Sequence, residues 1–345
     1  MKPSNFQQHI LAWFDQCGRK DLPWQKDLSP YRVWLSETML QQTQVVTVIP
    51  YFNTFIEKFP DIESLANAPV DEILHLWSGL GYYARARNLH KTAKLITRQG
   101  RFPDTLNELL DLPGIGQSTA GAILSIAFNK SYPILDGNVK RVLTRFKAIS
   151  GWPGNSAVNK ELWAISARLT PTTRVADYTQ AIMDLGATLC TRSKPNCGIC
   201  PLKADCLARL AGNMASFPTP KPAKTLPIKQ IVFLLLKDAS NRTLLEKRPP
   251  TGIWGGLWSL PEFDTFEAVQ NWCLVSNIDI TNQQTLATQR HTFSHYHLDY
   301  TPVLIQINNP SNFVMEANHS VWYKADQVIK LGLATPIKRL LQQKH

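Results

Sequence analysis

Residues 112–120 read LPGIGQSTA, and this stretch decides how the N-terminal part of the chain is interpreted. Gly114 and Gly116 flank one apolar residue, so the backbone can adopt positive φ there and another molecule can approach it closely. A helix that follows such a turn directs its free N–H groups outward, where an anion can bind. The pattern is typical of a helix-hairpin-helix, which holds DNA phosphates without reading the base sequence. A plain corner between two helices is the simpler interpretation of the same residues.

The residues on both sides of this stretch predict helices throughout residues 1–212. Apolar side chains recur there at three- and four-residue steps, and proline and glycine separate the periodic segments. These segments are Ile10–Phe14, Val33–Val46, Ile73–Leu80, Leu89–Ile96, Ala120–Phe128 and Val139–Phe146. We therefore expect a mainly α N-terminal body.

The character of the sequence changes after this body. Residues 213–228, NMASFPTPKPAKTLPI, contain four prolines and no helical periodicity, which predicts an extended linker. The strand-like runs IVFLLL, RTLLEKR and TPVLIQI follow it, and residues 265–275 and 325–343 have helical patterns. Residues 229–345 are thus expected to form a smaller α/β domain.

The chain carries a surplus of positive charge. Its 345 residues include 37 Lys and Arg against 26 Asp and Glu, a net charge of +11, which indicates a polyanionic partner. In the densest basic stretch, 79–103, one helical face without an interleaved acid carries Arg87, Lys91, Lys94 and Arg98. An ordinary solvated helix face is the alternative interpretation. No run of about 18 apolar residues and no secretory signal is evident, so we expect a cytoplasmic protein rather than a secreted or membrane protein.

Four of the six cysteines are closely spaced, at Cys190, Cys197, Cys200 and Cys206. Without a secretory signal a disulfide framework is not expected, so four thiols this close indicate either a zinc site or an iron–sulfur cluster. A structural zinc site usually has two C-x2-C pairs, whereas the spacing C-x6-C-x2-C-x5-C has one pair with unequal flanks. We therefore favour one 4Fe–4S cluster. Cys17 and Cys273 are isolated and are expected to pack in the core.

Two acidic residues stand among apolar neighbours. Glu37 lies in VWLSETMLQQTQV, where Val33 and Leu40 share its helical face, so burial should raise the pKa of its carboxyl. An ordinary glutamate on a helix surface is the alternative. Asp136 precedes an apolar helical pattern that begins at Val139, and this position fits a helix N-cap.

The motifs occur in a characteristic order along the chain. They are SETMLQQTQV (36–45), GLGYYARARNLH (79–90), LPGIGQSTAGAIL (112–124), LDGNVKRVL (135–143) and then the four cysteines. In this order they closely resemble the MutY family of adenine DNA glycosylases, in the endonuclease III-like helix-hairpin-helix superfamily. GIWGGLWSLPE (252–262) and HTFSHYHL (291–298) are similar to the second domain of that family, so the resemblance covers nearly the whole chain. It implies a helical glycosylase body with an iron–sulfur subdomain and a Nudix-like C-terminal domain.

The resemblance also implies an activity and a role for each site residue. The family excises adenine mispaired with 8-oxo-guanine, and also with guanine. Glu37 would protonate N7 of adenine as the general acid, and Asp136 would stabilise or trap the oxocarbenium-like sugar. Flipping the base leaves a gap in the duplex, which a wedge must fill. Pocket contacts are expected from Trp24, Asn138 and Gln180, and the wedge from Gln42 and Tyr82.

Ser118 separates hydrolysis from strand cleavage. Endonuclease III-type enzymes carry a lysine at the matching position, which forms a Schiff base, and a serine cannot do so. The resemblance therefore implies a monofunctional enzyme that acts as a monomer on double-stranded DNA containing an adenine–8-oxo-guanine mispair. A bifunctional glycosylase/lyase acting on oxidised pyrimidines is the alternative. DNA phosphates are expected at Gly114, Gly116, Ser118 and Lys140.

The C-terminal domain departs from active Nudix hydrolases. Pro261 and Glu262 are followed by FDTFEAVQNW, which lacks the paired glutamates that hold a divalent cation. We therefore expect a lesion-recognition module in which Phe293, Ser294 and His295 sense 8-oxo-guanine. An amphipathic strand is the simpler interpretation of this stretch. A Nudix-type nucleotide hydrolase and a non-catalytic DNA-binding protein are the remaining alternatives for the chain.

Overall fold

The structure is a computed structural model, and it describes residues 1–278, 280–308, 319–324 and 331–343. Internal contacts divide the chain into two compact units. The first unit joins Met1–Asn67 to Asn88–Ala223, and the second joins Ala68–Arg87 to Lys224–His345. The predicted limits of 1–212, 213–228 and 229–345 stay a prediction. No helix in the described ranges is long and apolar enough to cross a membrane.

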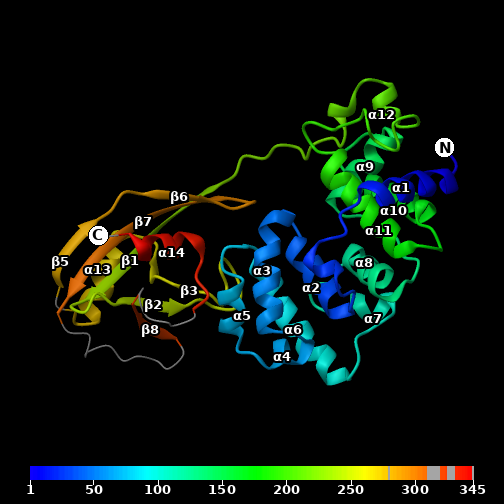
Figure 1. The fold of residues 1–345 in the computed structure, drawn as a ribbon. Coiled ribbons are helices and arrows are strands. Elements are labelled where there is room, and N and C mark those ends of the chain that lie inside the picture. The colour runs from blue at the N-terminus through cyan, green and yellow to red at the C-terminus, as the bar shows by residue number, and fades with distance from the viewer. Residues whose placement is uncertain (279, 309–318, 325–330, 344–345) are drawn as a thin grey trace. The chain divides into compact units, whose positions relative to one another are not determined.

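Every described element of the first unit is helical (Figure 1). Its α-helices are α1 (Pro3–Cys17), α2 (Pro30–Leu40), α3 (Val45–Lys58), α4 (Ile62–Asn67), α6 (Ala84–Gln99), α7 (Leu106–Leu110), α8 (Gln117–Phe128), α9 (Gly137–Lys147), α10 (Ser156–Leu169), α11 (Val175–Asp184) and α12 (Leu207–Leu210). Two short 3-10 turns, η1 (Pro23–Gln25) and η3 (Met214–Ser216), and a π-helical turn, η2 (Leu185–Leu189), accompany them. The expectation of a mainly α body is confirmed.

Helix α8 forms the core of the first unit. Residues Thr119–Ile126 are all buried, so protein surrounds this part of the helix. The helix packs against α2 and α11. A Cβ atom on Gly121 would lie 2.3 Å from the backbone oxygen of Pro133, so glycine lets the segment that leads to Asp136 run this close to α8.

The apolar pattern of residues 33–46 predicts one helical segment, and the structure divides it between two helices. Helix α2 ends at Leu40 and α3 begins at Val45. Between them Gln42 takes a left-handed conformation, with φ of 57°. The apolar period continues across the break because Val45 and Val46 are the first residues of α3. A single residue with positive φ does not change this period, so the pattern could not predict the break.

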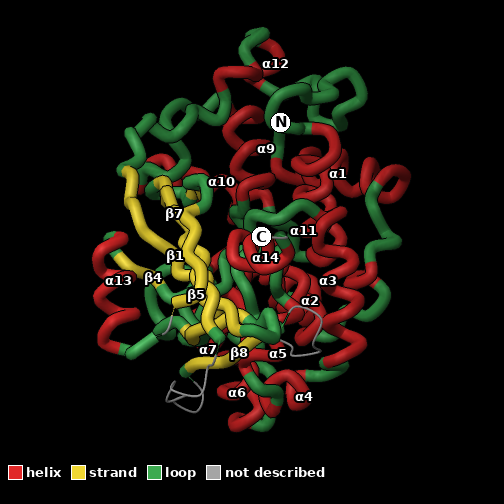
Figure 2. Tube along the Cα trace, turned by 90° about the vertical axis from the view of Figure 1, so that its left-hand side faces the viewer, coloured by secondary structure: helices red, strands yellow, loops and turns green. Residues whose placement is uncertain are grey.

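The second unit is built on one mixed sheet (Figures 1 and 2). Its strands are β1 (Ile228–Asp238), β2 (Thr243–Lys247), β3 (Trp258–Ser259), β4 (Glu262–Phe263), β5 (Ile280–Thr285), β6 (Gln289–Thr292), β7 (His297–Ile307) and β8 (Ser320–Tyr323). The main path runs β3-β2-β1-β7-β5, and β1 and β7 are parallel, with Ile228 opposite His297. The helices are α5 (Val70–Leu76), α13 (Phe266–Val275) and α14 (Thr335–Gln342), and α6 begins in this unit. The expected α/β character is confirmed.

The isolated cysteines differ in their surroundings. Cys273 of α13 belongs to a buried apolar cluster with Val269 and with Val303 of β7, as expected. Cys17 is exposed, so the expectation that it packs in the core is wrong. It is the last residue of α1 and lies beyond Phe14, the final buried residue of that helix.

Two predicted segments outside these elements can be compared with the structure. Within the predicted linker 213–228, residues 217–227 contain no helix or strand, whereas η3 occupies Met214–Ser216 and β1 begins at Ile228. Of the helix predicted for 325–343, α14 is present from Thr335, residues 331–334 are not helical, and residues 325–330 lie outside the described residues. Pro336 stands in the first turn of α14, where a missing N–H costs nothing.

Candidate active site

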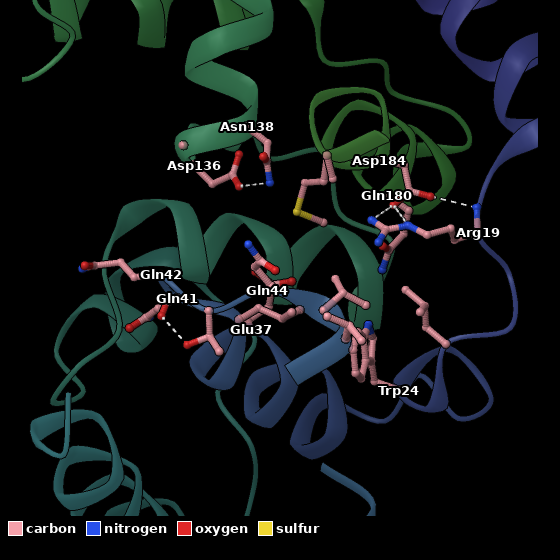
Figure 3. A pocket seen from close by; sticks show the side chains of 18 of the residues that line it. Arg19, Trp24, Glu37, Gln41, Gln42, Gln44, Asp136, Asn138, Gln180 and Asp184 are labelled. Atoms are coloured by element: carbon pink, nitrogen blue, oxygen red, sulfur yellow. Dashed lines mark hydrogen bonds and ion pairs between the residues drawn. The ribbon is translucent and has the colours of Figure 1, made fainter. Parts of the chain in front are cut away.

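A pocket of about 980 Å³ opens in the first unit (Figure 3). Its walls come from η1, α2, the turn between α2 and α3, the first turns of α8 and α9, and α11. The structure brings seven predicted site residues together on these walls: Trp24, Glu37, Gln42, Ser118, Asp136, Asn138 and Gln180. Residues as far apart in sequence as Trp24 and Gln180 thus share one cavity, and its volume lies in the usual range for ligand sites.

Glu37 stands in the last turn of α2, where that helix packs against α8. Its neighbours Ser36 and Thr38 are buried, and their hydroxyls donate to backbone oxygens of the same helix, at 2.9 and 2.8 Å. Burial raises the pKa of Glu37 to about 8, and the Asp136 carboxylate adds to the rise. The Glu37 carboxyl therefore carries a proton at pH 7, in the direction that the apolar spacing around it predicts.

Asp136 is the N-cap of α9 and also faces the pocket. Its Oδ1 accepts a hydrogen bond from the Val139 backbone N–H at 2.8 Å, and its Oδ2 accepts one from the Asn138 side-chain amide at 3.1 Å. Burial raises the pKa of Asp136, while these N–H donors and the nearby Arg141 guanidinium oppose the rise. The start of a helix also favours a negative charge. The N-cap expected from the sequence and the pocket carboxyl are therefore one side chain.

Arg141 joins this end of α9 to the cysteine loop. Its Nη2 donates to Asn138 Oδ1 at 2.8 Å and to the Gly186 carbonyl at 2.7 Å, and its Nε donates to the Cys190 carbonyl at 2.7 Å. Sequence reasoning did not select Arg141, because the Cys190 carbonyl lies 49 residues further along the chain. The sequence did offer one signal, because Arg141 follows Asn138 by three residues on a predicted helix and residues at this spacing can contact each other.

An ion pair at the pocket with a buried carboxylate was also missed. Asp184, at the end of α11, accepts from the Arg19 guanidinium at 2.5 Å and from the Arg19 backbone N–H at 2.8 Å. The pair fixes the segment that precedes Trp24 to the helix that carries Gln180 (Figure 3). No local pattern in the sequence indicates it, because the two residues are 165 positions apart.

The predicted phosphate contacts fall in two places. Gly114 has φ of 82°, as the hairpin pattern requires, and Gly116 is the N-cap of α8. Ser118 instead lines the pocket, and its Oγ accepts a hydrogen bond from the Leu135 backbone N–H at 3.0 Å. Lys140 lies on α9 and is not among the residues that line the pocket. The structure therefore groups Ser118 with the site carboxyls rather than with the other three.

The two predicted wedge residues share an uncommon backbone conformation. Gln42 has φ of 57° and Tyr82 has φ of 48°, in a left-handed region that residues other than glycine rarely adopt. Gln42 lines the pocket of the first unit, and Tyr82 belongs to the second unit, where its side chain is 51% exposed. Such conformations are concentrated at functional sites, so both positions are candidates for binding.

The predicted lesion-sensing residues form the turn between β6 and β7. The Phe293 backbone N–H donates to the Tyr296 carbonyl at 2.9 Å, and the two rings stack with centroids 4.8 Å apart. Ser294 and His295 are exposed at the tip. The turn therefore presents two polar side chains on an aromatic base.

The four closely spaced cysteines line one cavity beside Arg145. The buried Arg145 guanidinium donates to Cys190 Sγ at 3.4 Å and to the carbonyls of Thr191 and Arg192, which closes the loop around it. Burial raises the pKa of Cys200 to about 11, and the thiols of the other three cysteines add to the rise. A bound cation would favour the ionised form of the Cys200 thiol.

Comparisons with known proteins agree with these features. A family model described as HhH-GPD superfamily base excision DNA repair protein matches residues 35–168, one described as the iron–sulfur binding domain of endonuclease III matches 190–206, and one described as a NUDIX domain matches 231–343. A thermostable thymine-DNA glycosylase structure superposes with a TM-score of 0.53 at 28% identity, covering 61% of this chain and 97% of that one. An endonuclease III–DNA complex superposes with a TM-score of 0.51 at 21% identity over 60% and 94%, which shows the fold alone.

The matched ranges show that the chain is a DNA glycosylase of the helix-hairpin-helix superfamily, and the four cysteines fit one 4Fe–4S cluster. Full-length relatives narrow this class. The adenine DNA glycosylase of Buchnera aphidicola subsp. Acyrthosiphon pisum is 42% identical over 98% of this chain and 97% of its own, and that of Homo sapiens is 31% identical over 98% and 73%. The chain belongs to the adenine DNA glycosylase family, so the predicted resemblance, fold class, enzyme class and cofactor are confirmed.

Proposed function

We propose that this protein removes adenine from duplex DNA in which adenine lies opposite 8-oxo-guanine, by hydrolysis and without cutting the strand. One observation carries the proposal. Glu37, with a pKa of about 8, and Asp136 face the same pocket. A proton donor and a second carboxyl on one cavity are what the departure of a purine from its sugar requires.

The two carboxyls divide the reaction between them. Adenine leaves poorly as an anion, so Glu37 protonates N7 while the glycosidic bond breaks. The sugar then carries positive charge, which ionised Asp136 stabilises or captures before water completes the hydrolysis. N–H donors from Val139 and Asn138 and the positive charge of Arg141 favour the ionised form of Asp136, although burial is the larger influence and raises its pKa. In this proposal Glu37 is the acid, because burial raises its pKa, and Asp136 is the anion, because it caps the start of α9.

The other pocket residues hold the flipped base. Trp24 is a buried aromatic side chain in η1, and Asn138 is fixed between Asp136 and Arg141 by hydrogen bonds. Gln180 on α11 supplies an amide that can both donate and accept. An aromatic wall with two amides suits the ring face and the hydrogen-bonding edge of adenine.

Ser118 supports hydrolysis without a lyase step. Its hydroxyl lines the pocket and is already held by the Leu135 N–H, so this position offers no amine to attack the sugar. Lys140 lies on α9 and is not among the residues that line the pocket, and it is a phosphate contact in this proposal, together with Gly114 and Gly116. We place the protein in the cytoplasm as a monomer on DNA.

The cluster residues act through the loop that they close. A bound 4Fe–4S cluster would supply four iron–sulfur bonds that cross-link residues 190–206. Cys190, Cys197, Cys200 and Cys206 would hold it. Arg141 connects the Cys190 carbonyl to Asn138, so an ordered loop keeps the start of α9 in place.

The turn Phe293–Tyr296 is proposed to read 8-oxo-guanine, with Phe293, Ser294 and His295 as the contacts. Its exposed Ser294 and His295 carry the donors and acceptors that can distinguish the oxidised base from guanine. The residues that follow Pro261 and Glu262, FDTFEAVQNW, lack the paired glutamates that would hold a cation for Nudix hydrolysis.

Adenine release from matched duplexes tests the proposal. Single-turnover rates are measured with adenine opposite 8-oxo-guanine, guanine or cytosine, and borohydride trapping reports any Schiff base. We expect the fastest release opposite 8-oxo-guanine and no trapped complex. Glu37→Gln and Asp136→Asn should each abolish release while duplex binding persists. Equal rates opposite all three bases would overturn the lesion preference, and a trapped complex would favour the bifunctional alternative.

A further inference from the structure

One loop of the second unit, Gly252–Gly256, contacts the turn between β6 and β7. Trp254 in this loop is buried, and its ring centroid lies 5.5 Å from that of Phe293 and 5.6 Å from that of His291. The Trp254 ring also stacks on Phe233 of β1. Trp254 therefore holds the base of the turn against the sheet.

The next residue of the same loop contacts the start of α6. The Gly255 carbonyl accepts a hydrogen bond from the Arg87 guanidinium. Arg87 in turn donates its backbone N–H to the Tyr83 carbonyl at 3.1 Å, one helical turn earlier. The contact thereby reaches residues 78–83, the turn that carries Tyr82.

The turn 78–83 is anchored at a second point of the unit. Ser78 Oγ and Tyr83 OH both donate to the Leu333 carbonyl, at 2.8 and 3.2 Å. Asp71 of α5 pairs with Lys247 of β2 at 2.8 Å. The backbone beneath the exposed Tyr82 ring is thus held by the C-terminal part of the chain.

The loop Gly252–Gly256 is stiff. Trp254 has φ of 50°, which an aromatic residue keeps only when its surroundings impose it. The Arg248 Nε donates to the Ile253 carbonyl at 2.9 Å, and the Leu257 N–H donates to the Trp254 carbonyl at 2.9 Å. A Cβ on Gly255 would lie 2.7 Å from the Pro250 oxygen, so the loop is packed against its own chain.

We propose that the loop Gly252–Gly256 couples the β6–β7 turn to the 78–83 turn, with Trp254 and Arg87 as positioning residues. This inference rests on the proposed function, in which the first turn reads 8-oxo-guanine and the second carries the Tyr82 wedge. Contact of 8-oxo-guanine with the β6–β7 turn orders Phe293 against Trp254. The hydrogen bond between Gly255 and Arg87 transmits this ordering to the 78–83 turn, which then holds Tyr82 in the conformation that inserts into the duplex. When adenine lies opposite guanine, the contact of that base with the β6–β7 turn is weaker. Tyr82 is then held less firmly, and adenine is released more slowly.

Arg87→Gln tests the coupling, because it removes the charged donor to Gly255 and leaves both turns unaltered. The readouts are the ratio of single-turnover rates opposite 8-oxo-guanine and guanine, and the fluorescence of 2-aminopurine beside the lesion, which rises when Tyr82 breaks the stacking. We expect the ratio to fall about fivefold or more and the fluorescence rise to shrink. Arg87→Lys keeps a cationic donor and should restore part of both. Lys94→Gln, on the same helix, should slow both duplexes alike and leave the ratio unchanged.

A double-mutant cycle separates the possible results. If the coupling exists, Phe293→Ala lowers the ratio in the wild type but has little further effect in Arg87→Gln. If Phe293→Ala lowers the ratio and Arg87→Gln does not, the coupling is overturned and the proposed function stands. If Phe293→Ala leaves the ratio unchanged, lesion reading by this turn is overturned, and the coupling with it. Equal losses in Arg87→Lys and Arg87→Gln, without rescue, would show that Arg87 has a merely structural role.

Discussion

Replacing Glu37 with glutamine should abolish base release and yet make the protein more stable at neutral pH. In the folded protein the Glu37 carboxyl keeps its proton up to a pKa of about 8, whereas in the unfolded chain it ionises near pH ~4.3. Folding at pH 7 therefore requires the carboxyl to take up a proton. Glutamine has nearly the same shape and is neutral at every pH, so its burial carries no such cost.

The size of the effect follows from the two pKa values. Each pH unit above the unfolded pKa costs about 1.4 kcal/mol, which gives about 3–4 kcal/mol at pH 7 and about 1 kcal/mol at pH 5. Because the folded state binds the extra proton, its stability is highest below pH ~4.3 and falls as pH rises toward about 8. Glu37→Gln lacks this slope, so its advantage should grow by about 3 kcal/mol between pH 5 and pH 7.5.

The measurement is the unfolding of wild type and variant at both pH values, followed by the helical circular dichroism signal. A difference of about 3 kcal/mol moves the thermal midpoint by roughly 6–12 °C in a domain of this size. Glu161→Gln is the matched control, because Glu161 is exposed on α10 and its replacement should change stability by less than about 0.5 kcal/mol at either pH. If the difference in unfolding free energy between Glu37→Gln and wild type were the same at pH 5 and pH 7.5, Glu37 would be ionised in the folded protein. It could then not be the acid.

Four further outcomes are expected. The rate of adenine release should stay constant up to about pH 8 and fall above it, because Glu37 loses its proton there. The rate should also fall in acid, because Asp136, whose pKa is raised by burial, becomes neutral. Single-turnover rates across the pH range check this, and an unchanged rate well above pH 8 would contradict it. Gly121→Ala should destabilise the first unit by about 1–3 kcal/mol and slow base release, because the new Cβ displaces the Pro133 backbone that leads to Asp136. Gly137→Ala is its control in denaturant unfolding, since a Cβ there meets nothing within 4 Å, and equal losses would remove the packing explanation. Removal of the cluster by a chelator should expose residues 190–206 to proteases and weaken duplex binding. If base release were lost while duplex affinity and protease resistance stayed unchanged, the structural role of the cluster would be contradicted. Duplex affinity should fall steeply with salt, because each phosphate contact releases counterions, and a flat response in a filter-binding titration would rule out the basic surface as the DNA contact.

Several features of the fold were predictable because they are local. A helix that packs one face on a core has an apolar residue every three or four positions, and α6 and α9 follow that period. The N-cap at Asp136 and the positive φ at Gly114 depend on residues within one turn of the chain. The cysteine spacing likewise specifies a shared centre without reference to the rest of the fold.

Other features needed the folded chain. The break at Gln42 interrupts an unbroken apolar pattern, because α2 and α3 turn there to open the pocket. Arg87 belongs to a basic helical face in the sequence, and in the structure it donates to Gly255. Periodicity reports which face of a helix a residue occupies, and it does not report what the rest of the chain brings to that face.

By itself, the sequence determined which chemical groups the protein owns: an acid among apolar neighbours, a second carboxyl at a helix start, a serine in place of a lysine, and four cysteines at a cluster spacing. Only the tertiary structure decided that both carboxyls face one pocket and that Glu37 holds its proton at pH 7. The physical reason is that a pKa depends on the solvent and charges that surround a group. At Glu37 the packing of α2 against α8 excludes solvent, and the nearby charge is that of Asp136, which lies about a hundred residues away in sequence.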